Sequence, residues 1–346
     1  MSAPAEPPRV VLVTGGSGFL ASQLATRLAH RESVQRVIAV DAVRPHRRSL
    51  GRSEFHQADL GDHALVTLLE QAEVDTVVHA GVHKGPQRPG YERSGARLDV
   101  LGTLQLLAAC QHAPRVRRLV VVSSAAVYGA GPRDPALFGE DEPAHSVVSR
   151  GAADAVEVES CVRTFARRRT DVAVSVLRLA DLVGPQVRGP LTEHLTMPVV
   201  PTPLGFDARL QMLHSDDALA ALELATAVGV PGVFNVAADG VLTLSQAVRR
   251  AGRVPLPLPV PALAPVGRVL RGTRRVSFSA AQVALLTYGR VLDTSRVRGA
   301  LGFRPRWSTA DAYDSFLRAQ GLRPLTDQPV VRTLTAGATT VGGLLR

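Results

Sequence analysis

The chain has 346 residues, of which 45% are apolar and 20% charged, and this composition is typical of a folded globular protein rather than a disordered chain. The formal net charge is +10, but the arginines are spread along the whole sequence and aromatic residues make up only 4%, so we expect no nucleic-acid-binding surface. No apolar run approaches the ~20 residues that a membrane-spanning helix needs, so we expect no membrane partner.

Short apolar strands and amphipathic helices alternate through the first half of the sequence. We expect strands over residues 9–13, 37–40, 54–58, 76–80, 119–123 and 172–177, and a further strand over 233–236. Between these strands we expect helices over 19–30, 62–71, 97–111 and 151–168. This alternation, with strands that are nearly continuous apolar runs, predicts a Rossmann-type α/β fold built on a doubly wound parallel sheet.

The pattern changes after Pro185, where prolines become frequent and the loops lengthen. Within 253–265 the prolines recur every two to three positions, which argues against a helix there. Residues 293–306 are typical of a short helix that ends at Gly302. We expect a large domain over 1–185, completed by about 214–240, a smaller discontinuous lobe over 186–213 and 241–325, and a loose tail over 330–346.

A glycine-rich loop joins the first expected strand to the first expected helix. Glycines at this place allow a tight turn and the close approach of the backbone to a pyrophosphate, which the N-terminus of the helix attracts. Asp41 stands 23 residues beyond Gly18, at the end of the second strand, where its carboxylate would accept hydrogen bonds from an adenosine ribose. The pattern predicts that the protein binds NAD through Asp41 and the loop residues Gly15, Gly16, Ser17, Gly18, Phe19 and Leu20.

Three arginines that follow Asp41 are the argument for NADP. Arg44, Arg47 and Arg48 carry the positive charge that could hold a 2′-phosphate. They lie beyond the end of the strand, however, and the carboxylate of Asp41 would repel that phosphate. NAD is therefore the preferred cofactor.

Motifs along nearly the whole chain resemble one enzyme family. Thr14-Gly-Gly-Ser-Gly-Phe-Leu-Ala21 is similar to a Thr-Gly-x-x-Gly-x-x-Gly loop, and Ser123-Ser-Ala-Ala-Val-Tyr-Gly129 to Ser-Ser-x-x-Val-Tyr-Gly. The segment from Arg178 to Pro185 is similar to Arg-x-x-x-x-x-Gly-Pro. With these motifs the chain resembles the extended short-chain dehydrogenase/reductases, the NAD-dependent epimerase/dehydratases, and among them the UDP-glucose 4-epimerases.

The resemblance implies that a hydroxyl of a nucleotide-linked sugar is oxidised by hydride transfer to NAD. It places Ser124 at the reacting oxygen and gives Tyr128 only a supporting role in its loop. It adds four residues to the cofactor site: Asp59, Leu60, Ala80 and Gly81. It also implies a homodimer formed through the helices over 97–111 and 149–168. Ala125 and Ala126 stand where 4,6-dehydratases usually carry Asp-Glu, which argues against dehydration.

The family's catalytic Tyr-x-x-x-Lys pair is missing from this sequence. Its only lysine is Lys84, and the residues four positions after its tyrosines are Gly95, Pro132, Leu292 and Leu317. Asp99 stands where the family has the asparagine that supports the lysine. Loss of one positioned acid or base typically costs about 10²- to 10⁴-fold in rate.

Two alignments of the helix with the family motif remain open. If Glu157 is the family's helix glutamate, Ser149 stands at the tyrosine position and Ala153 at the lysine position. If instead Ser149 and Arg150 are its Ser-Lys pair, Ser146 and Arg150 take those positions. The first alignment is preferred because its distance to Arg178 is closer to the family's usual length.

Turnover would then need a substitute base, for which the candidates are His83, His145, Asp141 and Glu142. Two functions follow. The protein is either an NAD-dependent epimerase or oxidoreductase for a nucleotide-linked sugar, or a catalytically silent NAD(H)-binding sensor or scaffold.

Cys110 and Cys161 form neither a disulfide framework nor a zinc pattern, so we expect a cytoplasmic protein without a metal site.

Overall fold

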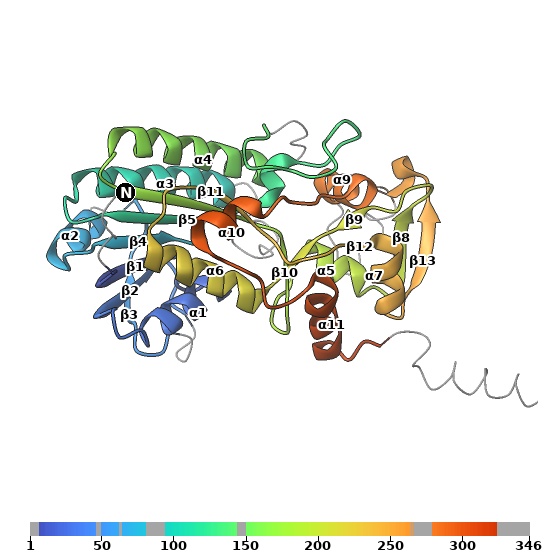
Figure 1. The fold of residues 1–346 in the computed structure, drawn as a ribbon, viewed down its shortest axis with the longest axis horizontal. Helices are drawn as coiled ribbons and strands as arrows, with labels where there is room; N and C mark the ends of the chain where they lie inside the picture. The colour runs from blue at the N-terminus through green and yellow to red at the C-terminus, as the bar shows by residue number, and fades with distance from the viewer. Residues whose placement is uncertain are drawn as a thin grey trace, which may run out of the picture.

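The computed structural model describes residues 7–45, 50–61, 64–80, 94–143, 150–263, 265 and 279–323, with the helical backbone alone at 94–99 and 150–151. Seven parallel strands form the main sheet in the order β11-β6-β5-β4-β1-β2-β3 (Figure 1). Their bounds are β1 Val10–Thr14, β2 Arg36–Asp41, β3 Glu54–Gln57, β4 Thr76–His79, β5 Arg118–Ser124, β6 Ala173–Leu179 and β11 Gly232–Val236. The predicted Rossmann-type α/β fold is confirmed.

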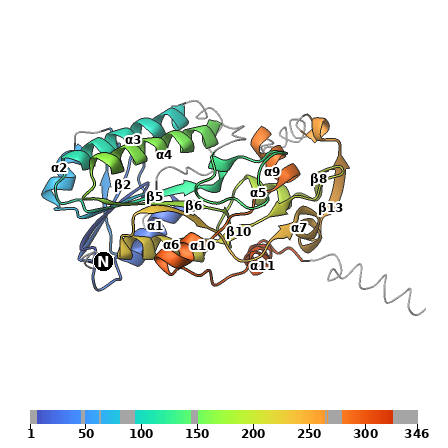
Figure 2. The same cartoon turned by 45° about the horizontal axis from the view of Figure 1, so that its top comes forward.

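Helices cover both faces of this sheet (Figure 2). On one face lie α2 (Ala64–Gln71), α3 (Ser94–His112) and α4 (Arg150–Arg168), and on the other α1 (Phe19–Leu28), α6 (Ser215–Val228) and α10 (Ser295–Leu301). Successive strand side chains enter opposite layers, so Val11 and Val13 belong to one hydrophobic cluster and Leu12 to the other. Both faces of the inner strands are buried, and these strands are therefore mostly apolar, whereas the edge strand β3 keeps Glu54 and Gln57 exposed.

The order of the strands reverses between β1 and β4. From β1 the chain runs outward to β2 and β3, and it then returns to β4 and continues to β5 and β6. Thr14 at the end of β1 pairs with Val40 on one side and with His79 on the other. The carboxyl ends of β1, β2 and β4 therefore meet at the place where open α/β sheets bind their ligands.

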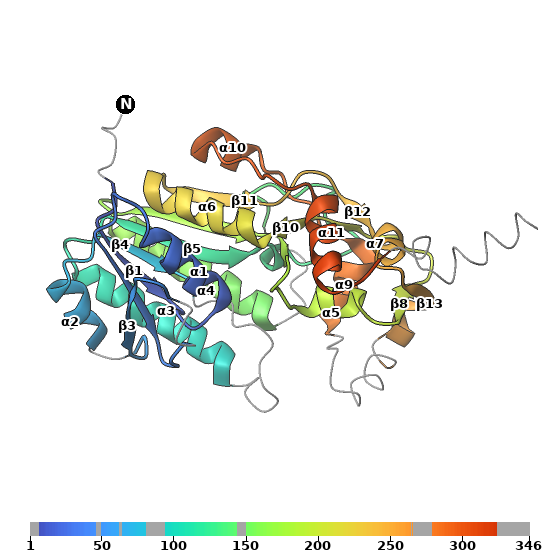
Figure 3. The same ribbon diagram turned by 90° about the horizontal axis from the view of Figure 1, so that it is seen from below.

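A separate hydrophobic cluster forms the core of the second lobe, which Figure 3 shows beyond one end of the main sheet. It includes Leu195, Val200, Leu286 and Tyr313. The elements of this region are β7 Asp181–Val183, α5 Pro190–Leu195, β8 Val199–Pro203, β9 Arg209–Leu210, β10 Met212–His214, β12 Leu242–Thr243, α7 Leu244–Arg250, β13 Val254–Leu258, α9 Ala280–Tyr288 and α11 Thr309–Ala319. We propose the predicted boundaries, 186–213 and 241–325, for this lobe.

The proline-rich segment 253–265 corrects one prediction. Its first half is strand β13, which pairs in parallel with β8, but residues 260–263 and 265 are helical. Pro261 lies in the first turn of that helix, where a backbone N–H has no intrahelical partner to lose, so proline is tolerated.

Helix α10 ends before Gly302 as predicted, with Gly302 in the left-handed region at φ 69°. The expected tail over 330–346 lies outside the described residues, and in the described part no helix has the length and apolar character to cross a membrane.

Candidate functional site

The glycine-rich loop turns tightly between β1 and α1. Gly15 has a positive φ of 75°, and the N–H of Gly18 donates to the carbonyl of Gly15 over 2.8 Å. The N–H of Gly16 donates to the carbonyl of Val40 in β2, and a Cβ on Gly16 would lie only 3.0 Å from the Cβ of Ala39. The loop therefore packs directly on β2. The first N–H groups of α1, at Phe19 and beyond, have no partner within the helix and can bind an anion.

Asp41 ends β2 and contacts this loop. Its Oδ2 accepts a hydrogen bond from the backbone N–H of Ser17 over 3.1 Å and another from the Ser17 hydroxyl. Its Oδ1 accepts from the N–H of Val43 over 3.2 Å. The sequence placed Ser17 in the loop but did not reveal that its hydroxyl orients the carboxylate expected to bind ribose.

The arginines that argue for NADP do not contact Asp41 where the structure describes them. Arg44 is exposed, and its Nε donates to the Gln57 side chain on β3 over 2.8 Å. Arg47 and Arg48 lie outside the described residues. The arrangement of Asp41 and Arg44 therefore favours NAD.

The other expected cofactor residues border the same edge of the sheet. Asp59 is exposed, and its Oδ1 accepts from the N–H of Gly61 over 3.3 Å. Leu60 packs toward α3, because a Cβ on Gly102 would lie 3.2 Å from its Cδ1. Ala80 follows β4 and is buried, whereas Gly81 lies outside the described residues.

His79, next to Ala80, is a buried structural residue. Its Nδ1 lies 2.7 Å from the hydroxyl of Thr14, and its Nε2 lies 2.8 Å from the hydroxyl of Thr103. It therefore joins β1, β4 and α3 beneath the cofactor loop. Burial holds the pKa of His79 at about 4, so it is neutral near pH 7.

Acid is expected to destabilise the protein through His79. Because the pKa of His79 is lowered to about 4 in the folded state, its contribution is complete above the unfolded pKa of ~6.5 and is lost as the pH falls toward 4. We expect the free energy of unfolding to fall by about 2 kcal/mol from pH 7 to pH 5 through this residue. Urea titrations at both pH values should show a smaller fall for His79→Gln. The exposed His30 gives the matched variant His30→Gln, which should lose as much stability as the parent between pH 7 and pH 5. If the free energy of unfolding falls equally in the parent, His79→Gln and His30→Gln, the role assigned to His79 is contradicted.

Ser124 lies at the carboxyl end of β5, where the family resemblance places it. It caps the short helix η1 (Ala125–Tyr128), and its Oγ accepts from the N–H of Ala126 over 3.1 Å. The orientation of this hydroxyl toward a cofactor stays a prediction. Tyr128 is buried, donates to Asn235 over 2.8 Å and accepts from Arg178 over 2.8 Å. Burial raises the pKa of Tyr128, so it is not a base near neutral pH.

A buried ion pair connects α4 to β6 beside this turn. Nη2 of Arg178 lies 2.7 Å from Oε2 of Glu159, and the two side chains are only 7% and 3% exposed. The hydroxyl of Ser123 donates to the same carboxylate over 2.6 Å. Glu159, which the sequence analysis did not single out, therefore faces the sheet.

The expected catalytic positions on α4 are only partly described. Ala153 and Glu157, from the preferred alignment, are both exposed, whereas Ala155 and Glu159 are buried. In an α-helix, residues four apart share a face, so Ala155 and Glu159 lie toward the sheet. Four further candidates fall where no side chain is described: Asp99, Ser146, Ser149 and Arg150.

The candidate substitute bases receive little support. His83 and His145 lie outside the described residues. Asp141 forms an ion pair with Arg296, which holds the pKa of that carboxyl below its usual range. Glu142 is exposed on the same segment. The described residues therefore do not place a substitute base beside Ser124.

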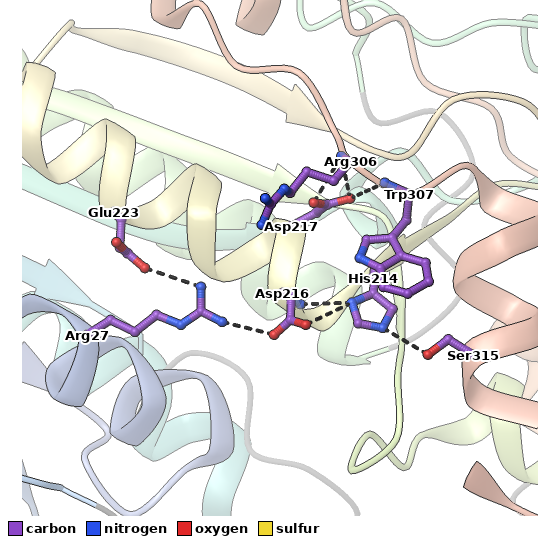
Figure 4. A network of polar contacts seen from close by, with 8 residues as sticks. All are labelled: Arg27, His214, Asp216, Asp217, Glu223, Arg306, Trp307 and Ser315. Carbon is purple, nitrogen blue, oxygen red and sulfur yellow. Dashed lines mark hydrogen bonds and ion pairs between the residues drawn. The ribbon is translucent and has the colours of Figure 1, made fainter. Parts of the chain in front are cut away.

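A polar network joins the large domain to the second lobe (Figure 4). Arg27 on α1 forms ion pairs with Asp216 and Glu223 on α6, at 2.9 and 3.3 Å. The fully buried Asp217 accepts backbone N–H groups of Arg306 and Trp307, each at 3.0 Å. These contacts fix the segment between α10 and α11 to the start of α6.

His214, Asp216 and Ser315 in Figure 4 resemble a hydrolase triad in composition but not in hydrogen bonding. The N–H of Asp216 donates to Nδ1 of His214 over 3.1 Å, so Nδ1 must be the acceptor and Nε2 must carry the proton. Nε2 then donates to Ser315 over 3.3 Å and cannot activate its hydroxyl. The ring also stacks on Trp307 with centroids 4.4 Å apart, so His214 is a packing residue at the lobe junction.

Comparison with known proteins identifies relatives of this chain. The model of the NAD dependent epimerase/dehydratase family matches residues 11–237. A Mycobacterium tuberculosis protein, described only as uncharacterized, is 45% identical over 330 residues, which cover 94% of this chain and 88% of that protein. The dTDP-L-rhamnose 4-epimerase of Burkholderia thailandensis is 32% identical over 132 residues, which cover 35% of this chain and 36% of that protein.

Solved structures share the fold. MoeE5 in complex with UDP-glucuronic acid and NAD superposes with a TM-score of 0.67 at 23% identity, covering 90% of this chain and 98% of that chain. The UDP-glucose 4-epimerase of Thermotoga maritima, solved with UDP-glucose, gives the same TM-score and coverage at 18% identity. At these identities the likeness establishes the architecture.

Proposed function

Because the chain belongs to the NAD dependent epimerase/dehydratase family, we propose that it binds NAD and oxidises a hydroxyl of a nucleotide-linked sugar. The contact between Asp41 and the glycine-rich loop carries this proposal. It sets an oriented carboxylate beside a helix N-terminus at the point where the strand order reverses. NAD-bound relatives of the same fold support it.

The residues present fit NAD. Gly16 has no room for a side chain against β2, and the N-terminus of α1 offers free N–H groups to the pyrophosphate. Asp41 would accept the adenosine ribose hydroxyls, and Asp59 and Leu60 would border the adenine. Bound NAD would accept a hydride from the carbon that bears the substrate hydroxyl. Ser124 would hold the oxygen of that hydroxyl.

We propose a third alignment of α4 with the family motif. If Glu159, which binds Arg178, is the helix glutamate instead of Glu157, the same spacing moves the tyrosine position to Gly151 and the lysine position to Ala155. The burial of Ala155, at 4% exposed, supports this alignment over the exposed Ala153. In this alignment, too, small residues replace both catalytic side chains.

The missing tyrosine and lysine support a second candidate function, an NAD(H)-binding protein without turnover. One assay separates the two. Purified protein is incubated with NAD and a panel of UDP- and dTDP-hexoses, while NADH absorbance and the sugar epimers are followed. Formation of an epimer or of NADH supports the enzyme. Tight NAD binding without any turnover across the panel supports the silent protein.

A homodimer formed through α3 and α4 remains part of this proposal. Leu101 and Leu104 on α3 are 52% and 44% exposed in the single chain, as expected for side chains that pack on a second copy. Sedimentation of the full chain tests it.

Removing the carboxylate of Asp41 is expected to weaken NAD binding by about 1–2 kcal/mol, the scale of hydrogen bonds to a charged group. The preference for NAD over NADP should narrow in Asp41→Ala, because the charge that repels a 2′-phosphate is gone. Calorimetry with both cofactors measures this. Glu32→Ala, at an exposed acid outside the expected cofactor site, is the control and should leave both affinities unchanged. Tighter binding of NADP than NAD by the parent would contradict the cofactor assignment.

A further inference from the structure

A cavity of about 360 Å³ lies at the amino-terminal edge of the main sheet, opposite the edge that carries the cofactor loop. Its charged lining residues are Arg9, Asp75, Arg117, Arg118 and Asp171. Each of them lies at, or within two residues of, the start of β1, β4, β5 or β6, and the first residues of these parallel strands gather at one edge. The cavity is therefore separate from the NAD site proposed above, and its volume suits a small molecule.

A buried arginine lines this cavity. Arg118, the first residue of β5, is only 4% exposed. Gly229, the C-terminal cap of α6, leaves space for its side chain, because a Cβ at that position would lie 2.4 Å from Nε of Arg118. The guanidinium is thus held by packing, so a ligand that binds it does not have to order a flexible side chain.

Two exposed arginines line the same cavity. The guanidinium of Arg9 has no hydrogen bond or ion pair with any residue that the structure describes, although the backbone N–H of Arg9 donates to Asp75. Arg117 is 61% exposed in its side chain, and its Nη1 lies 2.8 Å from Oδ2 of Asp171. Because a guanidinium has five N–H donors, most donors of Arg9 and Arg117 remain available to a ligand.

The two carboxylates of the cavity already have hydrogen-bond donors. Asp171 accepts from Nε and Nη2 of Arg169, both at 2.8 Å, and these hydrogen bonds lower the pKa of Asp171 to about 2. Both oxygens of Asp75 also accept, from two backbone N–H groups and a threonine hydroxyl. Four guanidiniums, those of Arg169 and of the three lining arginines, thus stand against two carboxylates. The described part of this region therefore carries an excess of two positive charges.

We propose that this cavity binds a small multivalent oxyanion, which contacts the buried guanidinium of Arg118 and the exposed guanidiniums of Arg9 and Arg117. Guanidiniums bind phosphate and carboxylate oxygens alike through paired N–H donors, so the ligand is a small molecule that carries two or more anionic oxygens. The inference does not rest on the proposed function, because the cavity lies at the edge of the sheet opposite the cofactor loop.

Calorimetry on the full chain with saturating NAD tests the site with inorganic pyrophosphate and with citrate, which distinguish a phosphate from a carboxylate ligand. We expect saturable binding of at least one of them, and Arg9→Gln and Arg117→Gln should each raise its Kd by about 10-fold, the scale of one hydrogen bond to a charged group. Arg118→Gln should abolish the binding. Arg318→Gln is the matched control, because Arg318 is an exposed arginine on α11 in the second lobe (Figure 1), and its Kd should equal that of the parent.

The absence of saturable binding of both anions to the parent would overturn the site. Binding that Arg9→Gln and Arg117→Gln leave unchanged would also overturn it, because the anion would then lie elsewhere on the protein. An equal loss in these two variants and in Arg318→Gln would do the same, since it would show a response to net charge alone. If Arg118→Gln does not fold, the two exposed arginines still decide the result.

Discussion

Replacing Gly151 with tyrosine and Ala155 with lysine is expected to raise sugar-dependent NADH formation or epimerisation by about 10²-fold over the parent. Residues four apart share one helix face, so the two side chains would point the same way. The positive charge of the lysine lowers the pKa of the neighbouring tyrosine from ~10 toward neutrality and makes it a usable base. Gly151→Tyr alone lacks that charge and should gain little.

The competing alignments supply the matched controls for this prediction. Ser149→Tyr with Ala153→Lys tests the alignment built on Glu157, and Ser146→Tyr with Arg150→Lys tests the remaining one. Each variant must first show parental NAD affinity and a cooperative unfolding transition. A gain confined to the Ser149 and Ala153 pair would reject the alignment built on Glu159. No gain in any pair would favour the silent NAD(H)-binding protein.

Asp217→Ala is expected to lower the free energy of unfolding by about 4 kcal/mol. The carboxylate of Asp217 is fully buried and accepts the backbone N–H groups of Arg306 and Trp307. Removing it costs the hydrogen bonds to this charged group, each worth about 1.5–3 kcal/mol, and leaves two part-buried backbone donors without their acceptor. The junction between α6 and the second lobe should therefore loosen.

The neighbouring residue provides the control. Asp216 is 55% exposed in its side chain and pairs with Arg27 at the surface, so Asp216→Ala should cost less than about 1 kcal/mol. Trp307 is the only tryptophan in the chain and belongs to this junction, so its fluorescence reports the transition directly in urea. Equal losses in the two variants would contradict the role assigned to Asp217.

The sequence by itself determined the sheet and the cofactor loop. Mostly apolar strands, helices with one apolar face and glycines between β1 and α1 are local signals, because the side-chain period and the turn geometry are set within a few residues. Asp41 was likewise predicted from its distance along the chain, and the structure places its carboxylate against the glycine-rich loop. The helix at 260–263 was missed because recurring prolines conceal that a helix can begin at one of them.

Only the tertiary structure decided which side of α4 faces the sheet. Glu157 and Glu159 are equally acceptable in sequence, but residues two apart on an α-helix point about 200° apart around its axis. The side chain that each glutamate meets therefore distinguishes them, and it is Glu159 that forms an ion pair with Arg178 on β6. The contacts of Ser17 with Asp41 and of Asp217 with Trp307 likewise join residues far apart in the chain. Local periodicity cannot show such contacts, because they exist only after the layers and lobes have packed together.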